Sequence, residues 1–262
     1  MLTAIERLQL RFSELADPDI HPNFHARIAI LDVGGLLHID FRGTPFSDAF
    51  NELCSALVRP NVASVLGSLY LKSPDEGANG TCNWDLSFLV AAEVSFPRLR
   101  SFTVAQNEPG AHNRIIVAED HDEAGVLGLL LHKAPALDTL VVPSAPDSTF
   151  FSVDHLALRY LDVDAGYDTQ GFIANLADNS CFPALQAMAF GEFNETYLDD
   201  YPAGCTPFED YRRLFLAPHF PSVRSFVWRN PACSSDQIAE LRALRPKRDL
   251  QIHIVRFSDA YV

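Results

Sequence analysis

FPRLRSFTV at residues 96–104 is one of three similar phrases in the chain, and the others are FPALQAMAF at 182–190 and FPSVRSFVW at 220–228. The apolar letters keep their places while the polar letters vary. In each phrase a proline stands two residues before apolar residues in the pattern LxxLxL, in which Phe, Met, Val or Trp can replace Leu. Because proline ends a preceding helix and favours an extended backbone, each phrase predicts the start of a β-strand.

The pattern LxxLxL occurs six times along the chain. The copies start at Leu66, Leu99, Leu137, Leu158, Leu185 and Val223. Neighbouring copies are 21 to 38 residues apart, which lies in the range of small structural repeats. We therefore expect six strands whose connections are long enough to hold helices.

Helices are expected between these strands. The predicted ranges are 46–58, 84–94, 122–133, 170–178, 206–220 and 234–244. In the fifth range Thr206 is the expected N-cap and Pro207 the first helical residue, while Ser234 and Gln237 have the spacing of a capping box in the sixth. A last strand is expected at 250–255. Strand and helix thus alternate, which is typical of a parallel sheet with helical crossovers.

Polar residues inside the pattern indicate that one face of this sheet is open. Strands covered on both faces read as continuous apolar runs, but here polar residues alternate with apolar ones. Two solvent-facing rows are predicted: Ser68, Ser101, Thr139, Tyr160, Ala187 and Ser225 form one, and Tyr70, Thr103, Val141, Asp162, Ala189 and Val227 form the other.

The repeated LxxLxL resembles the leucine-rich-repeat family, whose repeat continues as LxxLxLxxN or LxxLxLxxC. The resemblance covers about residues 61–256 and is closest to divergent bacterial cytoplasmic members. Only the copy at Leu99 has the family's asparagine, as Asn107, so irregular loops are expected at that edge. The resemblance implies an α/β solenoid with a parallel sheet on one face and helices on the other, and it implies no activity.

The N-terminal part of the chain is expected to cover the end of this solenoid. The stretch RIAILDVGGLLHIDF at 27–41 has Gly34 and Gly35 between two apolar runs, which predicts a two-residue β-hairpin. We assign residues 1–60 to an N-terminal cap made of an amphipathic helix and a β-hairpin. Residues 61–262 are assigned to the leucine-rich-repeat solenoid as one continuous domain.

Composition places the chain among soluble cytoplasmic proteins. Apolar residues make up 48% and charged residues 21% of the sequence, and the chain contains no apolar run long enough to span a membrane. Its start lacks the uninterrupted apolar core of a secretory signal. The five cysteines are scattered and never spaced as CxxC, so neither a disulfide framework nor a structural zinc site is expected.

Net charge is the one extreme of composition. The chain has 34 acidic and 20 basic residues, which gives a net charge of −14. This balance opposes binding to nucleic acid or an anionic membrane and favours a basic protein as partner. Solubility alone also explains an acidic surface, and both explanations stay open.

No motif points to catalysis or to a cofactor. GxSxG, Walker and GxGxxG motifs are absent. The segment DVDAGYD at 162–168 lacks the glycine placement and closing glutamate of a calcium loop. His21 and His25 are expected in a solvated turn, and AEDHDEAG at 118–125 is expected to be a soluble loop before a helix. We expect no enzyme activity, no metal and no cofactor.

Acidic residues gather in the connecting segments, most densely in EFNETYLDDYPAGCTPFEDY at 192–211. Aromatic residues interleaved with carboxylates are suitable anchors for a basic protein. The predicted partner-binding residues are Glu192, Phe193, Glu195, Tyr197, Asp199, Asp200, Tyr201, Tyr160, Asp162 and Asp164.

These observations predict a non-catalytic protein-binding scaffold that engages a basic partner through acidic loops. A concrete version is an immunity or inhibitor protein that neutralises a cationic toxin or nuclease. Two alternatives stay open: an enzyme with a site built from loops, and a carbohydrate or small-ligand binder that uses the sheet face.

Overall fold

A computed structural model gives the fold. It describes residues 26–75, 77, 80–108, 110–118, 123–193, 201–218, 220–244 and 251–256. The described residues form a mixed α/β structure around a nine-stranded, mostly parallel sheet. In spatial order its strands are β1 (Arg27–Val33), β2 (Leu36–Arg42), β3 (Leu66–Lys72), β5 (Ser101–Val104), β7 (Thr139–Val142), β8 (Tyr160–Asp164), β9 (Ala187–Gly191), β10 (Ser225–Arg229) and β11 (Gln251–Val255). Since β1 and β11 lie at opposite edges, the sheet does not close into a barrel.

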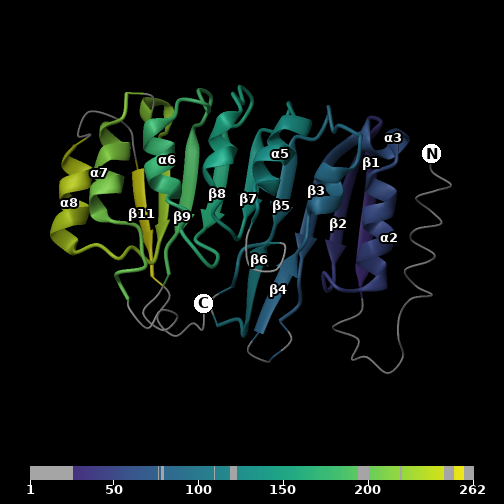
Figure 1. The fold of residues 1–262 in the computed structure, drawn as a ribbon, viewed down its shortest axis with the longest axis horizontal. Coiled ribbons are helices and arrows are strands. Elements are labelled where there is room, and N and C mark those ends of the chain that lie inside the picture. Colours follow the sequence, from purple (N-terminus) through teal and green to yellow (C-terminus); the bar gives the residue numbers. More distant parts are fainter. Residues whose placement is uncertain are drawn as a thin grey trace.

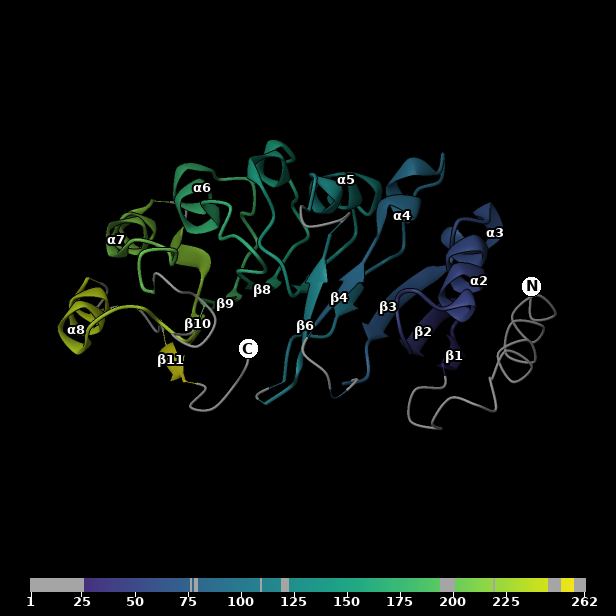
Figure 2. The same cartoon turned by 60° about the horizontal axis from the view of Figure 1, so that its bottom comes forward.

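Helices follow most of the strands along the chain. They are α2 (Asp48–Leu57), α3 (Pro60–Ala63), α4 (Ser87–Ala91), α5 (Val126–Lys133), α6 (Phe172–Asp178), α7 (Phe208–Leu216) and α8 (Ser235–Ala243), with the 3-10 turns η2 (Ser148–Ser152) and η3 (Phe220–Ser222). The helices lie on one side of the sheet and leave its other side uncovered (Figure 1, Figure 2). No helix in the described part of the chain is both long and apolar enough to cross a membrane.

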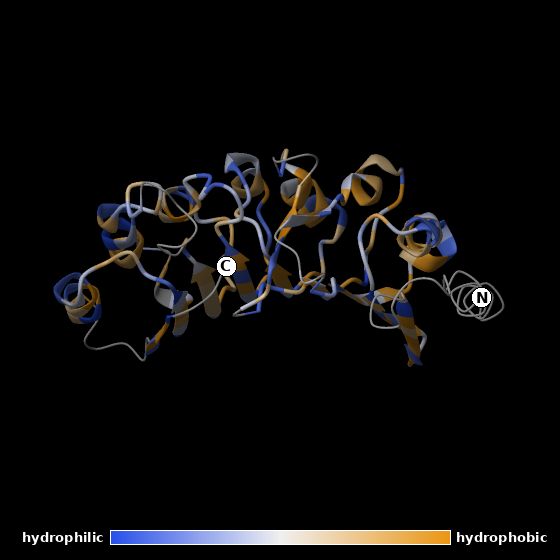
Figure 3. Ribbon diagram, turned by 90° about the horizontal axis from the view of Figure 1, so that it is seen from below, coloured by the Kyte–Doolittle hydropathy of each residue, from blue (hydrophilic) through white to orange (hydrophobic). Residues whose placement is uncertain are grey.

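The predicted strands are confirmed at all six copies of the pattern, because β3, β5, β7, β8, β9 and β10 fall on them. Apolar and polar residues alternate along the strands (Figure 3). On β5, Phe102 and Val104 are fully buried, whereas Ser101 and Thr103 are half-buried on the uncovered face. The six strands therefore place their fixed apolar positions in the core, and most of their variable positions are half-buried on the uncovered face.

The hairpin at the N-terminal end of the sheet is also confirmed. Gly34 and Gly35 have φ angles of 61° and 79°, a left-handed conformation that glycine adopts without a steric penalty. β1 and β2 pair antiparallel on either side of them. β2 then pairs parallel with β3, so the hairpin is an integral part of the main sheet.

One helix start was predicted correctly and one was not. Ser234 and Gln237 form the expected capping box of α8. The predicted N-cap at Thr206 is wrong, because Pro207 occupies that position and α7 begins at Phe208. The Thr206 hydroxyl is buried without capping a helix amide, because Thr206 belongs to the packed loop whose amide donates to the buried carboxylate of Glu192 at 3.1 Å.

A second sheet was not predicted. In the described residues β4 (Gly80–Trp84) and β6 (Asn113–Val117) pair parallel with each other, outside the main sheet. Each follows a main strand, β3 or β5, and precedes a helix. They were missed because neither carries LxxLxL, although all five residues of β6 are buried.

The core between sheet and helices is continuous. One cluster of buried apolar residues extends from Leu37 on β2 to Leu241 on α8. Aromatic rings contribute at its C-terminal end, where the centroids of Tyr211 and Trp228 lie 4.2 Å apart. The main strands and the long helices thus share one apolar interior, which provides a rigid base for the surface described next.

Candidate functional site

Two rows of side chains cross the uncovered face of the sheet. Strand pairing places His38, Ser68, Ser101, Thr139, Tyr160, Ala187 and Ser225 side by side, and it places Asp40, Tyr70, Thr103, Val141, Asp162, Ala189 and Val227 side by side. The predicted order of the two rows is therefore confirmed and extends onto β2. The prediction that every member faces solvent is wrong at Asp162 and Ala189, which are buried; Asp162 is enclosed by the side chains that bind it. Small and uncharged residues dominate both rows.

A buried ion cluster interrupts this neutral face where β8 and β10 end. Arg229 Nη2 lies 2.5 Å from Asp162 Oδ1 and 2.7 Å from Asp164 Oδ1. Arg229 Nε also donates to Asp164 Oδ1, at 2.9 Å. The three side chains are only 12 to 17% exposed. An arginine on β10 therefore forms ion pairs with two carboxylates on β8 across the strand between them.

Gly191 on β9 makes this reach possible. Strand pairing places it directly between Asp164 and Arg229. A Cβ atom at Gly191 would lie 1.9 Å from Asp164 Oδ1 and 3.1 Å from Arg229 Nε. The glycine is thus required by space, because its φ angle is not in the left-handed region.

We predict that Gly191→Ala lowers the free energy of unfolding by about 2 to 3 kcal/mol, because the new methyl group must displace the Asp164–Arg229 pair. Urea denaturation followed by circular dichroism measures the loss. Ala187→Ser adds one atom on the same strand, at a half-buried position, and should cost less than about 0.5 kcal/mol. Equal midpoints for the two variants would contradict the close approach.

Tyr160 and Gln106 complete the surroundings of Asp162. The Tyr160 hydroxyl donates to Asp162 Oδ2 at 3.0 Å, and Gln106 Nε2 donates to Asp162 Oδ1 at 3.1 Å. Gln106 Nε2 also donates to the carbonyl oxygen of Val142, at 2.9 Å. Burial, with the nearby Asp162 carboxylate, raises the pKa of Tyr160 to about 12. The network thereby ties β5, β7, β8 and β10 together.

Burial also sets the protonation behaviour of the ion cluster. It raises the pKa of Asp164, and Asp162 acts in the same direction while Arg229 opposes both. Burial opposes the charge on Arg229, but Asp164 and Asp162 together raise its pKa above the usual value. Asp162 and Asp164 were both predicted to bind a partner, but their carboxylates already have ion-pair and hydrogen-bond partners within the protein.

Glu192, another predicted partner-binding residue, is internal. It is 6% exposed, and its carboxylate accepts hydrogen bonds from the Tyr211 hydroxyl and the Thr206 amide. Burial raises the pKa of Glu192 and holds the pKa of Tyr211 well above its usual value. The side chain joins the end of β9 to the start of α7.

Phe193 is internal as well, with 4% of its surface exposed. Its ring lies 5.2 Å from the guanidinium carbon of Arg114, a distance suited to a cation–π contact. Phe193 packs with Ala165 and Cys205, and the half-buried Tyr201 lies against this group. Arg114 donates to the Gly166 carbonyl oxygen, so β6 is fastened to the loop after β8.

The remaining predicted partner-binding residues, Glu195, Tyr197, Asp199 and Asp200, lie outside the described residues and stay predictions. The same holds for His21 and His25. In the part of the chain that the structure describes, no group of three or more His, Cys, Asp or Glu side chains is arranged to hold a metal ion. Asp168 in DVDAGYD accepts a hydrogen bond from the Gln170 amide.

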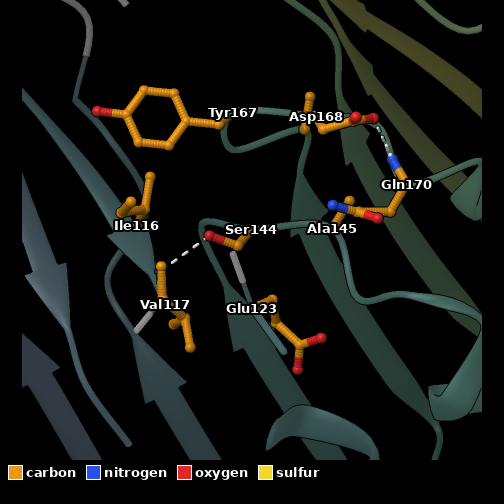
Figure 4. Close-up of a pocket in the computed structure, with 10 residues that line it drawn as sticks. Ile116, Val117, Glu123, Ser144, Ala145, Tyr167, Asp168 and Gln170 are labelled. Atoms are coloured by element: carbon orange, nitrogen blue, oxygen red, sulfur yellow. Dashed lines mark hydrogen bonds between the residues drawn. The ribbon is translucent and has the colours of Figure 1, made fainter. Parts of the chain in front are cut away.

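A small pocket opens beside the loops that follow β6, β7 and β8 (Figure 4). Its lining includes Ser144, Tyr167, Gln170 and the buried Glu123. The Glu123 carboxylate accepts hydrogen bonds from the amides of Gly125 and Leu127. Burial raises the pKa of Glu123 to about 7. Since its oxygens already serve the first turn of α5, Glu123 has a structural role.

Sequence reasoning missed three residues of this site. Arg229 and Gly191 stand two residues after Val227 and Ala189, the last row members on β10 and β9. If the predicted strand pairing is extended by these two residues, it places Arg229 and Gly191 beside Asp164. Arg114 had no local signal, since its partners Gly166 and Phe193 are 52 and 79 positions away in the sequence.

No family model matches the chain, and no curated protein matches its sequence. What the protein does must therefore follow from the chemistry of its own surfaces.

Proposed function

We propose that the chain is a divergent leucine-rich-repeat solenoid and a non-catalytic scaffold that binds a basic protein through the acid-rich segment after β9. The single observation that supports this most is that the two ends of that segment contact each other on the scaffold. We call these joined ends the closed base of the segment. Glu192 accepts from the Thr206 amide at 3.1 Å, and Cys205 Sγ lies 3.9 Å from the Phe193 carbonyl oxygen. The segment thus leaves and re-enters the scaffold at one place.

A closed and buried base favours binding. Residues that are held before the partner arrives lose less conformational freedom on association. Phe193 and Tyr201, which stand on either side of the acidic residues in the sequence, pack on the scaffold and are held in this way. Carboxylates carried on a fixed base steer a basic partner and set its orientation.

The charges of the sheet face support the same choice of surface. Asp162 and Asp164 share the single positive charge of Arg229, and Asp40 pairs with Arg42 at 3.1 Å. These three carboxylates and two arginines leave only one negative charge in excess on the sheet face. The negative charge that would attract a basic protein must therefore come from the loops, and an immunity or inhibitor protein against a cationic toxin or nuclease is the concrete form of this proposal.

The test is affinity capture from the host at low and high salt with three versions of the chain. We expect the wild-type chain to capture a basic protein at low salt and to release it at high salt. The variant Glu195→Gln, Asp199→Asn, Asp200→Asn should lose it. The matched control Glu93→Gln, Asp154→Asn, Asp236→Asn removes the same charge from exposed positions elsewhere and should retain it.

Two results would overturn the proposal. Equal capture by the loop variant and the control would show that the acid-rich segment is not the contact. A wild-type chain that captures no basic protein at either salt concentration would remove the proposed partner.

A further inference from the structure

A second charged feature lies at the end of the sheet where the strands begin, opposite the end where the ion cluster lies. Five residues that immediately precede strands form one row: Arg100, Asp138, Arg159, Gln186 and Arg224. In each neighbouring pair the amide of the later residue donates to the carbonyl oxygen of the earlier one at 2.8 or 2.9 Å. The row therefore runs without interruption along the end of the sheet at which β5, β7, β8, β9 and β10 begin. We call Arg100, Arg159 and Arg224 the arginine row.

The guanidinium groups of this row are exposed and weakly engaged. The Arg100 side chain is 68% exposed and lies 3.7 Å from Asp138. Arg159 and Arg224 are exposed, and their side chains form no hydrogen bond or ion pair in the described structure. Arg212, Arg213 and Arg229, in contrast, each lie within ion-pair distance of two carboxylates.

The local charge is opposite to that of the whole chain. Arg98, also exposed, stands two residues before Arg100, so the five row residues together with Arg98 include four arginines and one acidic residue, Asp138. The chain as a whole carries a net charge of −14. In an acidic protein with abundant carboxylates, a line of exposed arginines, two of which make no ion pair in the described structure, is a surface complementary to an external negative group.

We propose that the arginine row is a docking surface for an acidic, extended segment of another protein. Its members precede every second strand of the sheet, namely β5, β8 and β10. Because neighbouring strands are about 4.8 Å apart, successive arginines are spaced by about 10 Å. A polyproline II segment rises about 3.1 Å per residue with three residues per turn, so every third side chain returns to one side after about 9 Å. A segment with an acidic residue at every third position fits this spacing.

An acidic peptide suits the row better than a nucleic acid. A long polyanion would meet the field of the whole acidic chain, which opposes its approach. At physiological salt, charges are screened beyond about 8 Å, so a short peptide on the row responds mainly to the nearby arginines. The arginine row lies where the strands begin and is positively charged, whereas the proposed basic-partner site follows the end of β9 and is acidic. The proposal for the row does not depend on that site.

Fluorescence anisotropy with a labelled peptide of Glu-Pro-Pro repeats tests the proposal. We expect salt-sensitive binding to the wild-type chain and tighter binding than for a peptide of the same composition with its glutamates in one block. Arg159→Gln with Arg224→Gln should weaken binding about tenfold. The matched control, Arg27→Gln with Arg59→Gln, removes two other exposed arginines and should bind like wild type. So should Glu195→Gln, Asp199→Asn, Asp200→Asn.

Four outcomes would overturn the proposal. One is the absence of peptide binding to the wild-type chain at low salt, and another is equal loss in the row variant and its arginine control. A single-stranded oligonucleotide that outcompetes the peptide at physiological salt and depends on Arg159 and Arg224 would assign the row to nucleic acid. A dimer in sedimentation experiments that the row variant abolishes would assign it to a second copy of this chain.

Discussion

Phe102→Asp is expected to unfold the protein or to lower its free energy of unfolding by more than about 4 kcal/mol, whereas Thr103→Asp should cost less than about 1 kcal/mol. The two positions are neighbours on β5 but face opposite sides. Phe102 is fully buried and pairs in register with Leu69 and Leu140. A carboxylate there would be buried without a partner, while a carboxylate at the half-buried Thr103 reaches water.

Urea denaturation of both variants, followed by circular dichroism and intrinsic fluorescence, measures this difference. Thr103→Ser is the control for a change on the uncovered face that adds no charge. Equal midpoints for Phe102→Asp and Thr103→Asp would show that the register of the sheet is wrong, because one of the two positions would then face the wrong side.

Arg229→Met should lower the free energy of unfolding by about 3 to 5 kcal/mol at neutral pH. Methionine replaces the aliphatic part of the arginine but leaves Asp162 and Asp164 without their ion-pair partner in a nearly buried site. Removing one partner of a buried ion cluster has a cost of this size. In a chain that carries Asp162→Asn and Asp164→Asn, the same substitution should cost less than about 1.5 kcal/mol, since no charge is stranded.

The loss in Arg229→Met should also grow with pH. Burial already raises the pKa of Asp164 against the attraction of Arg229, and removal of the arginine raises it further. A carboxyl with a raised pKa binds its proton more tightly in the folded chain than in the unfolded chain. Its contribution to stability is therefore present at acid pH and is lost as the pH rises through the folded pKa.

Denaturation of wild type and Arg229→Met at pH 5 and pH 8 measures this dependence. A loss that is the same at both values, or the same with and without the two asparagine substitutions, would mean that Arg229 acts only through packing. The ion cluster would then have no role in holding β8 to β10.

Much of the fold was predictable because each strand repeats a local rule. A proline or turn is followed by apolar residues two and three positions apart, and this spacing places Leu99, Phe102 and Val104 in the core wherever the strand happens to pair. Gly34 and Gly35 specify their hairpin in the same local way, through backbone angles that glycine adopts freely. The capping box at Ser234 is local as well.

The candidate site was less predictable because its side chains meet across strands. Asp162 and Asp164 were identified as acidic residues, but their partner Arg229 lies 65 or more positions away in the sequence. Glu192 and Phe193 were predicted to be contact residues because acids and aromatics are common in binding loops. Their burial depends on Tyr211, Thr206 and Arg114, whose proximity no local pattern reveals.

The sequence by itself determined the order of the six repeated strands and the helices between them, the face of each of these strands that enters the core, and the acidic excess of the chain, since these follow from residue spacing and composition. Tertiary structure alone decided which charges are neutralised and which stay available. An ion pair between residues far apart in the sequence forms only when the fold brings their side chains within a few ångströms, as the register of β8, β9 and β10 does here. For that reason Arg229 forms ion pairs with Asp162 and Asp164. Arg159 and Arg224 carry the same charge but remain exposed where β8 and β10 begin.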